Sequence, residues 1–214
     1  MPGREPQYER RVFLALIAAG SGGYLLWARR PANSGPPPPT RVRIAGFDAG
    51  GLPTGVVEVD VIRKTNSEWM KQLPADSYSV TRQKDTEFAG TGAYDKFYED
   101  GIYRCICCGT AVFDSKAKYA SGTGWPSFTE PIAKENVVEA PSAYFGIRET
   151  EVKCARCDAH LGHVFDDGPP PGNLRYCINS VALRFVARAA ADTGTFGGSG
   201  TWACSLAALE RNPA

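Results

Sequence analysis

The stretch "YRCICCGT", residues 103–110, places three cysteines within four positions, at Cys105, Cys107 and Cys108. Cys105 and Cys108 form a C-x-x-C pair, whose two intervening residues allow one tight turn to present both sulfur atoms to one metal ion. A matching pair, Cys154 and Cys157, follows after 45 intervening residues. Two such turns complete a tetrahedral site of four cysteines, so we expect a zinc ion that joins two distant hairpins.

Disulfide bonds are the alternative for these four cysteines, and they would suit a protein exported to an oxidising compartment. The chain has seven cysteines, and an odd number leaves one unpaired in a purely disulfide framework. The matched spacing of the two pairs therefore favours zinc. A closed site of four cysteine ligands has no position for water or substrate, so the expected zinc is structural.

The charge of the chain is small overall but unevenly distributed. The net charge of +1 gives no field that would attract nucleic acid, and we expect no such partner. Residues 1–43 carry seven arginines and two glutamates, whereas the rest of the chain has a net charge of −4. This asymmetry marks the N-terminus as a separate functional piece.

An uncharged run of 17 residues, Val12–Ala28, lies between two arginine pairs near the N-terminus. A membrane span needs about 20 apolar residues. A short apolar run after positive charges fits an export signal, and "RRVFL" resembles a twin-arginine signal. The alternative is an uncleaved membrane anchor formed by residues 12–28. We therefore expect a protein that is exported, for instance to the periplasm, or anchored to the membrane, in preference to a cytoplasmic one.

Four consecutive prolines, Pro36–Pro39, are expected to form a stiff extended linker after the apolar run. This linker separates the N-terminal segment from the rest of the chain. The expected parts are a signal or anchor with its linker at 1–40, an extension of short strands at 41–63, a main domain at 64–188, and a loose tail at 189–214.

The main domain is predicted to be mainly β, with short helices at its start. "NSEWMKQLP" has a cap candidate at Asn66 or Ser67 and a stop at Pro74, and a second short helix is expected within 75–84. From Gly101 onward, short segments rich in β-branched and aromatic residues predict strands. These segments are "GIYRCI", "TAVFDS", "EVKCAR" and "LRYCINSVALRFV".

Cys177 lies in the last of these segments. In one strand over 174–185, Arg175, Cys177 and Asn179 share a face, because side chains alternate. A neighbouring guanidinium favours the thiolate, which is the nucleophilic form of cysteine. The alternative is a buried, inert cysteine, which is the commoner fate of a lone thiol.

Two further elements carry chemistry-bearing side chains. The two histidines of the chain, His160 and His163, directly follow the second cysteine pair in "CDAHLGHVFDDG". A histidine pair can supply general acid chemistry, although core histidines or metal ligands are alternatives. The glycine-rich "SGTGWPSF" at 121–128 displays Trp125, which can wall an apolar pocket or simply pack in the core.

Together these motifs resemble the type-B methionine sulfoxide reductases over residues 64–187. The matching pieces, in the family order, are C-x-x-C-G at 105–109, "SGTGWPSF", C-x-x-C with "DAHLGHVF" across 154–165, and "RYCINSVALRF" at 175–185. The resemblance implies two antiparallel sheets with short N-terminal helices and a structural zinc site of four cysteines. It also implies reduction of the R epimer of methionine sulfoxide in oxidised proteins or peptides.

The resemblance assigns roles to residues of this chain. Cys177 would attack the sulfoxide sulfur and become a sulfenic acid, while Arg175 would favour its thiolate. His160 and His163 would bind and protonate the sulfoxide oxygen, and Asn179 would orient them. Trp125 would wall the pocket for the methyl group on sulfur, with Phe165 nearby. The opposing interpretation is a zinc-stabilised binding module, which needs neither a thiolate nor an acid pair.

One position departs from the family pattern. Many members carry a resolving cysteine after the first glycine of the tryptophan loop, where this chain has Thr123. A sulfenic acid returns to the thiol through a second thiol. Cys107 and Cys204 are the two cysteines without another role, so one of them is a candidate resolving thiol. The alternative is direct reduction by a thioredoxin-like or other thiol reductant. We expect the protein to be a monomer.

Overall fold

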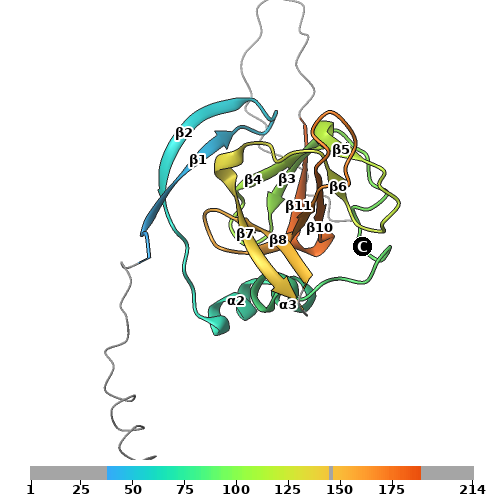
Figure 1. Cartoon of the computed structure of the whole chain (residues 1–214). Coiled ribbons are helices and arrows are strands. Elements are labelled where there is room, and N and C mark those ends of the chain that lie inside the picture. Colours follow the sequence, from blue (N-terminus) through green and yellow to red (C-terminus); the bar gives the residue numbers. More distant parts are fainter. Residues whose placement is uncertain (1–37, 145–146, 189–214) are drawn as a thin grey trace, which may run out of the picture. The chain divides into compact units, whose positions relative to one another are not determined.

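Antiparallel strands dominate the part of the chain that the computed structural model describes, residues 38–144 and 147–188 (Figure 1). The largest sheet has six strands, and its order is β5 (Lys118–Tyr119), β6 (Ser127–Phe128), β10 (Arg175–Ile178), β9 (His160–Phe165), β8 (Ile147–Cys154) and β7 (Val137–Tyr144). A second sheet has three strands, in the order β11 (Leu183–Ala187), β3 (Gly101–Cys105) and β4 (Ala111–Asp114). The predicted fold class, mainly β with antiparallel sheets and short helices, is confirmed.

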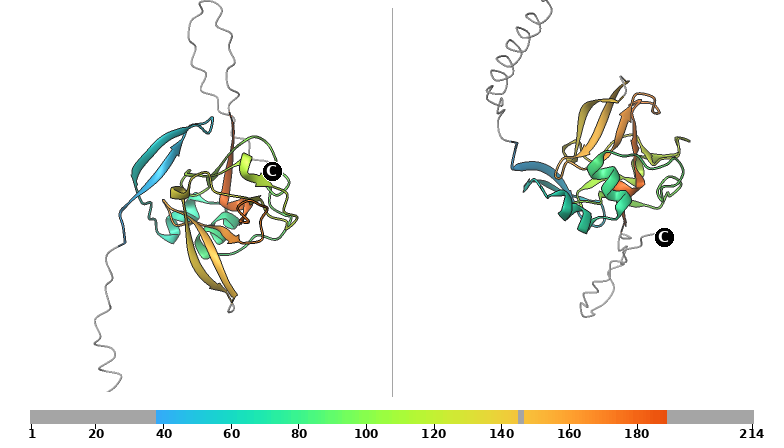
Figure 2. Two further views of the ribbon diagram at one scale, coloured as in Figure 1. Left: turned by 45° about the horizontal axis from the view of Figure 1, so that its top comes forward. Right: turned by 90° about the horizontal axis from the view of Figure 1, so that it is seen from below.

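Short elements complete the described part. Two α-helices precede the large sheets, α2 (Asn66–Gln72) and α3 (Ala75–Gln83), and they lie next to each other in Figure 1. Three single-turn 3-10 helices are η1 (Ser115–Ala117), η2 (Lys134–Asn136) and η3 (Ser180–Ala182). In Figure 2 the long β7–β8 hairpin stands out from the rest of its sheet.

The first helix begins one residue earlier than the sequence suggested. Asn66 and Ser67 were the cap candidates, but the capping residue is Thr65. The Thr65 hydroxyl accepts from the backbone N–H of Glu68, and the Glu68 carboxylate accepts from the backbone N–H of Thr65 at 2.8 Å. This reciprocal capping box gives hydrogen-bond acceptors to two backbone N–H groups that have no acceptor within the helix.

The segment predicted as one strand over 174–185 is instead two strands in different sheets. β10 ends at Ile178, and η3 turns the chain so that β11 joins the three-stranded sheet. The turn is stabilised by Glu87, whose carboxylate accepts from the backbone N–H groups of Ser180 and Val181 at 2.8 and 3.0 Å. Such a tertiary contact leaves no local signal in the segment itself.

Aromatic side chains from both sheets form the core between them. Phe113 of β4 stacks on Phe128 of β6 with ring centroids 4.5 Å apart, and Tyr103 of β3 meets Phe128 edge-on at 5.1 Å. All three side chains are fully buried. Because each sheet contributes one side of these contacts, the core holds the two sheets together face to face.

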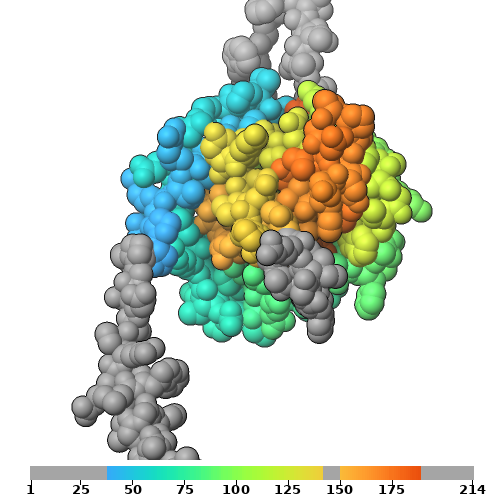
Figure 3. Space-filling model, viewed as in Figure 1, coloured from blue at the N-terminus to red at the C-terminus, as the bar shows by residue number. Residues whose placement is uncertain are grey.

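The extension at 41–63 forms the predicted short strands, β1 (Arg41–Phe47) and β2 (Pro53–Asp60), paired as a hairpin. Figure 3 shows this hairpin (blue) directly beside the segment around η2 (yellow). The contact depends on Asn136, which is fully buried. Its side-chain oxygen accepts from Ala45 N at 2.8 Å, and its amide donates to the carbonyls of Ala45 and Ala111 at 2.9 and 2.8 Å.

Some expectations lie outside the described residues, including the apolar run Val12–Ala28 and the tail that carries Cys204. Within the described ranges, no helix is long and apolar enough to cross a membrane. The division of the chain into the four parts given above stays a proposal.

We predict that Asn136→Leu lowers the free energy of unfolding by about 3 kcal/mol, because three backbone groups lose their partner in a buried place. Urea unfolding followed by circular dichroism measures the change. Glu58→Gln on the exposed β2 strand is the control, and it should change the stability by no more than about 0.5 kcal/mol. Equal stability of the Asn136 variant and the control would contradict a clamping role for Asn136.

Candidate functional site

The two cysteine pairs meet at the ends of strands from different sheets. Cys105 ends β3, Cys154 ends β8, and each is followed by a tight turn that carries the second cysteine of its pair. In the first turn Gly109 donates to the carbonyl of Cys105 at 2.8 Å and adopts a φ of 76°, which glycine reaches without strain. In the second turn Asp158 takes the corresponding position, with a φ of 57°.

The geometry of the four sulfur atoms fits zinc. All four Sγ atoms lie within 4.8 Å of one another, with Cys105 to Cys157 at 3.7 Å and Cys108 to Cys154 at 3.5 Å. Zn–S bonds of about 2.3 Å place tetrahedral sulfur ligands about 3.8 Å apart. A disulfide needs about 2.05 Å, and all four cysteines are free thiols in the structure. The cluster could therefore hold a zinc ion, and the distances favour zinc over the disulfide alternative.

Cys107, the third cysteine of the opening stretch, lies beside this cluster and is 5% exposed. Its Sγ donates to Thr81 Oγ1 of α3 at 3.4 Å. The thiol is therefore enclosed between the metal-binding turn and a helix.

A row of side chains crosses the six-stranded sheet in register and contains Cys177. Tyr119 of β5 pairs with Ser127 of β6, Ser127 pairs with Cys177 of β10, Cys177 pairs with His163 of β9, and His163 pairs with Glu151 of β8. Directly opposed residues in a sheet point to the same face. The register therefore sets the Cys177 thiol beside a histidine.

The glycine between the two histidines makes this row possible. A Cβ on Gly162 would meet the backbone carbonyl of Cys177, so only glycine allows β9 and β10 to approach here. An irregularity in the β8–β9 register between Val152 and Lys153 lets His160 sit next to His163, with ring centroids 5.2 Å apart.

Burial dominates the ionisation of Cys177. Burial raises the pKa of this thiol above its ordinary value, although Arg175 and a hydrogen bond from Thr123 act in the opposite direction. Thr123 Oγ1 lies 4.0 Å from the sulfur. The expectation that Arg175 favours the thiolate is right for its own contribution, but the net direction favours the thiol because desolvation is the larger effect.

His160 is almost fully buried, and its two ring nitrogens differ sharply. Nδ1 lies 2.9 Å from the Glu151 carboxylate, whereas Nε2 has no hydrogen-bond partner among the described residues. Burial lowers the pKa of His160, and the hydrogen bond to Glu151 opposes that shift without cancelling it. The neutral ring is therefore favoured, with the proton on the nitrogen that faces the carboxylate.

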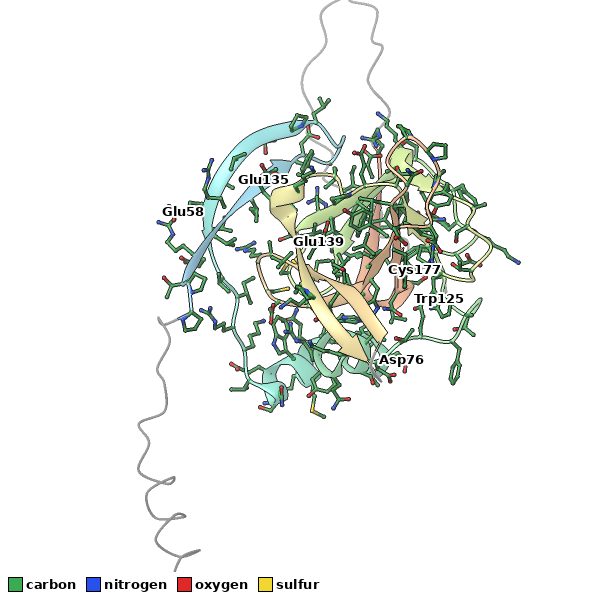
Figure 4. The ribbon with its side chains drawn as sticks, in the orientation of Figure 1. Glu58, Asp76, Trp125, Glu135, Glu139 and Cys177 are labelled. Carbon is green, nitrogen blue, oxygen red and sulfur yellow. The ribbon has the colours of Figure 1, made fainter. Side chains whose placement is uncertain are left out.

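Trp125 and Asn179 are both held by the loop that follows α3. The Trp125 indole N–H donates to the carbonyl of Glu87 at 3.1 Å, and the Asn179 side-chain oxygen accepts from the Glu87 N–H at 3.1 Å. The Asn179 amide also donates to Leu161 O between the histidines, at 3.1 Å. Figure 4 shows Trp125 and Cys177 on the same side of the ribbon.

Arg175 is oriented by a partner that sequence reasoning missed. Its guanidinium donates two hydrogen bonds of 2.7 Å to the two oxygens of Asp167. The same guanidinium lies over the Phe165 ring, 4.4 Å from its centroid. These contacts fix the plane of the cation beside β10 and place Phe165 next to Arg175.

Comparison with known proteins assigns the family. A family model described as the SelR domain matches residues 73–187, which is more than half of the chain. The chain belongs to the SelR-domain family. A curated relative from Pseudomonas fluorescens (strain Pf-5), named peptide methionine sulfoxide reductase MsrB, is 54% identical over 130 residues, covering 61% of this chain and 100% of the relative.

Two further curated relatives carry the same name. A protein of the same name from Pseudomonas syringae pv. syringae is 53% identical over 130 residues, covering 61% of this chain and 99% of the relative. One from Hahella chejuensis is 50% identical over 127 residues, covering 59% of this chain and 91% of its own length.

The structure brings together the candidate residues that it describes, and it adds others. Cys177 and the two histidines lie on the adjacent strands β10 and β9, and Arg175 pairs with Phe165 on the same two strands. Asn179 and Trp125 are joined through the backbone of Glu87. Sequence reasoning missed Glu87, Glu151 and Asp167. Glu151 lies within β8, where an acidic residue is a weak signal because its neighbours depend on strand pairing that a single sequence does not reveal. Glu87 and Asp167 lie in loops, and their partners are distant in sequence or follow from the fold.

We predict that the purified protein holds one zinc ion through Cys105, Cys108, Cys154 and Cys157. Cys154→Ser should lose the metal and lower the melting temperature by at least about 10 °C, because metal binding is coupled to folding. Cys107→Ser is the matched control from the same motif and should keep the zinc. Metal analysis and thermal unfolding measure both, and retention of full zinc content by Cys154→Ser would refute the assignment.

Proposed function

We propose that this protein is a thiol-dependent peptide-methionine (R)-S-oxide reductase, which returns the R epimer of methionine sulfoxide in oxidised proteins to methionine. Membership of the SelR-domain family, with relatives named peptide methionine sulfoxide reductase, supports sulfoxide reduction in general. The observation that carries the finer proposal is the register that sets the Cys177 thiol opposite His163.

Cys177 is the proposed nucleophile, and it attacks the sulfoxide sulfur. A sulfoxide oxygen leaves poorly unless it is protonated, so His160 and His163 are proposed to bind it and supply the proton. The products are methionine and a sulfenic acid on Cys177. Asn179 supports this arrangement because its amide fixes the carbonyl of Leu161, the residue next to His160.

The proposed selection of one epimer rests on two unlike sides of the site. Trp125 offers an indole face for the methyl group on sulfur, with its N–H already satisfied by Glu87. Phe165 continues the aromatic side under the Arg175 guanidinium. The histidines form the polar side, which accepts the oxygen. Only one configuration at the sulfur places the methyl group against the aromatic side and the oxygen against the histidines.

Further parts of the proposal concern partners and location. We propose oxidised proteins or peptides as substrates and a thioredoxin-like or other thiol reductant as the electron donor. Export, or anchoring through residues 12–28, stays a proposal that rests on the sequence of the N-terminus. The monomeric state of the protein is also a proposal.

The test is reduction of a peptide that contains methionine-R-sulfoxide, with dithiothreitol as the reductant. We expect turnover by the full chain and none by Cys177→Ser, because a serine hydroxyl is a far weaker nucleophile at neutral pH. The S-epimer peptide should remain unreduced. Glu58→Gln, a substitution on the exposed strand β2, is the control for effects of mutation and purification, and it should leave turnover unchanged. Activity that survives in Cys177→Ser, or reduction of the S epimer alone, would reject the proposal.

Recycling of the sulfenic acid generates a separate prediction. Cys107 is buried against Thr81, so we propose Cys204 as the thiol that forms a disulfide with Cys177. With thioredoxin as the reductant, Cys204→Ser should slow steady-state turnover at least about tenfold while a single turnover stays intact. Cys107→Ser should resemble the wild type. If both variants keep full thioredoxin-driven activity, recycling uses the external thiol directly and the internal-thiol proposal fails.

A further inference from the structure

Glu151 is a buried carboxylate that no sequence motif pointed to. It lies on β8, is 4% exposed, and uses both oxygens. Oε1 lies 2.9 Å from Nδ1 of His160, and Oε2 accepts from Lys84 Nζ at 2.9 Å. A buried ionised carboxylate is costly unless it is paired and hydrogen-bonded, so the two contacts account for its presence at this depth.

Lys84 reaches Glu151 from the end of α3. It caps the helix in the left-handed conformation, with φ of 62°, and its side chain is 63% exposed. Burial is the largest single effect and raises the pKa of Glu151, but the hydrogen bonds and charge interactions with Lys84 and His160 together outweigh it, so the net pKa lies below its ordinary value. The carboxylate is therefore ionised at neutral pH.

The pair Glu151 and His160 defines which ring nitrogen is free. Because the carboxylate accepts a hydrogen bond from the Nδ1 proton, the neutral His160 ring carries its lone pair on Nε2. Nε2 is one of two buried side-chain polar atoms without a partner in the described residues, the other being the hydroxyl of Tyr119. This buried nitrogen can accept a hydrogen bond or a proton from a group that arrives during the reaction.

Glu151 and His160 both lie beside His163, the register partner of Cys177. Glu151 and Cys177 are the two register partners of His163, one on each side, and His163 contacts the His160 ring at a centroid distance of 5.2 Å. The charged and titratable groups that face His160 are Glu151 from β8, His163 from β9 and Lys84 from the end of α3. The network therefore runs from the exposed Lys84 to His163, the histidine that pairs in register with Cys177.

We propose that Glu151 is a positioning residue for the reaction. It holds His160 with Nε2 free and steadies the positive charge that this ring acquires when it takes a proton, and Lys84 moderates that effect. The proposal rests on the proposed function, since it concerns the proton that sulfoxide reduction must move.

The atoms and electrons of the step balance without a further reactant. Attack by Cys177 forms an S–S bond to the methionine sulfur. Transfer of the oxygen to the Cys177 sulfur then breaks this bond and the S–O bond of the sulfoxide, and forms the S–O bond of the sulfenic acid. The methionine sulfur gains two electrons, and the Cys177 sulfur loses two. The thiol proton ends on the oxygen of the sulfenic acid. A base that takes this proton from the thiol and returns it to the oxygen is sufficient, and a neutral His160 has the free nitrogen for that task.

Glu151→Gln tests the role of the charge, because glutamine keeps the size of the side chain and can still accept from Nδ1. In the zinc-bound full chain, we expect the rate of methionine formation in a single turnover to fall at least about tenfold. KM for the R-sulfoxide peptide should change by less than about twofold, because Glu151 acts through His160 and does not touch substrate. Glu151→Asp should recover part of the rate. Glu139→Gln on the neighbouring strand, which loses a carboxylate that accepts from Tyr176 at 2.6 Å, is the matched control and should keep the rate.

The pKa of His160, followed by NMR, separates positioning from a merely structural role. Removing the carboxylate charge in Glu151→Gln destabilises the imidazolium, so the pKa of His160 should fall. Removing the cation in Lys84→Met leaves Glu151 unopposed, so the pKa should rise. Opposite signs support the proposal, whereas a fall in both variants or no shift in either would overturn it. Lys84→Met alters a largely exposed side chain, so it is informative even if Glu151→Gln fails to fold. In that case a rise in the pKa of His160 supports the proposal, and a fall or no change overturns it.

The outcomes also distinguish this inference from the proposed function. If the wild-type chain reduces no R-sulfoxide, the proposed function fails. If the wild type is active and Glu151→Gln is equally fast in a single turnover, only the positioning role of Glu151 is rejected.

Discussion

The convergence of four cysteine thiols at the ends of β3 and β8 is the constraint on which the rest of the structure depends. β3 belongs to the three-stranded sheet and β8 to the six-stranded sheet, so the cluster ties the two sheets together at one edge of their shared core. A zinc ion of fixed Zn–S length and tetrahedral angle would set the relation of the two turns more rigidly than side-chain packing alone.

The same cluster lies between the strands that carry Glu151 and the two histidines. Glu151 precedes Cys154 by three residues on β8, and His160 follows Cys157 by three residues at the start of β9. The turn that carries Cys157 thus connects Glu151 to His160, the histidine that this carboxylate contacts. A closed metal site can hold this turn while taking no part in the chemistry, since it offers no open coordination position.

Desolvation gives the site its resting charge state. Burial raises the pKa of Cys177 and lowers the pKa of His160, so each group favours its neutral form. The ionised groups are the neighbours of these two residues, and they form two ion pairs, Glu151 with Lys84 and Arg175 with Asp167. Charge would therefore develop at the sulfur and the imidazole only during the reaction, in surroundings whose fixed charges are already oriented to receive it.

The sequence by itself identified the fold class, the four cysteines that could hold a metal ion, and the proposed nucleophile. C-x-x-C spacing, the paired histidines and strand-forming composition are local properties that survive in a one-dimensional pattern. The tertiary structure alone decided where the strand after Cys177 ends, which strands flank it, and which acidic residues serve the site. Glu87 ends the strand by accepting from Ser180 and Val181, and Glu151 meets His160 through strand pairing. Such contacts depend on sheet register, which long-range packing sets and local sequence does not.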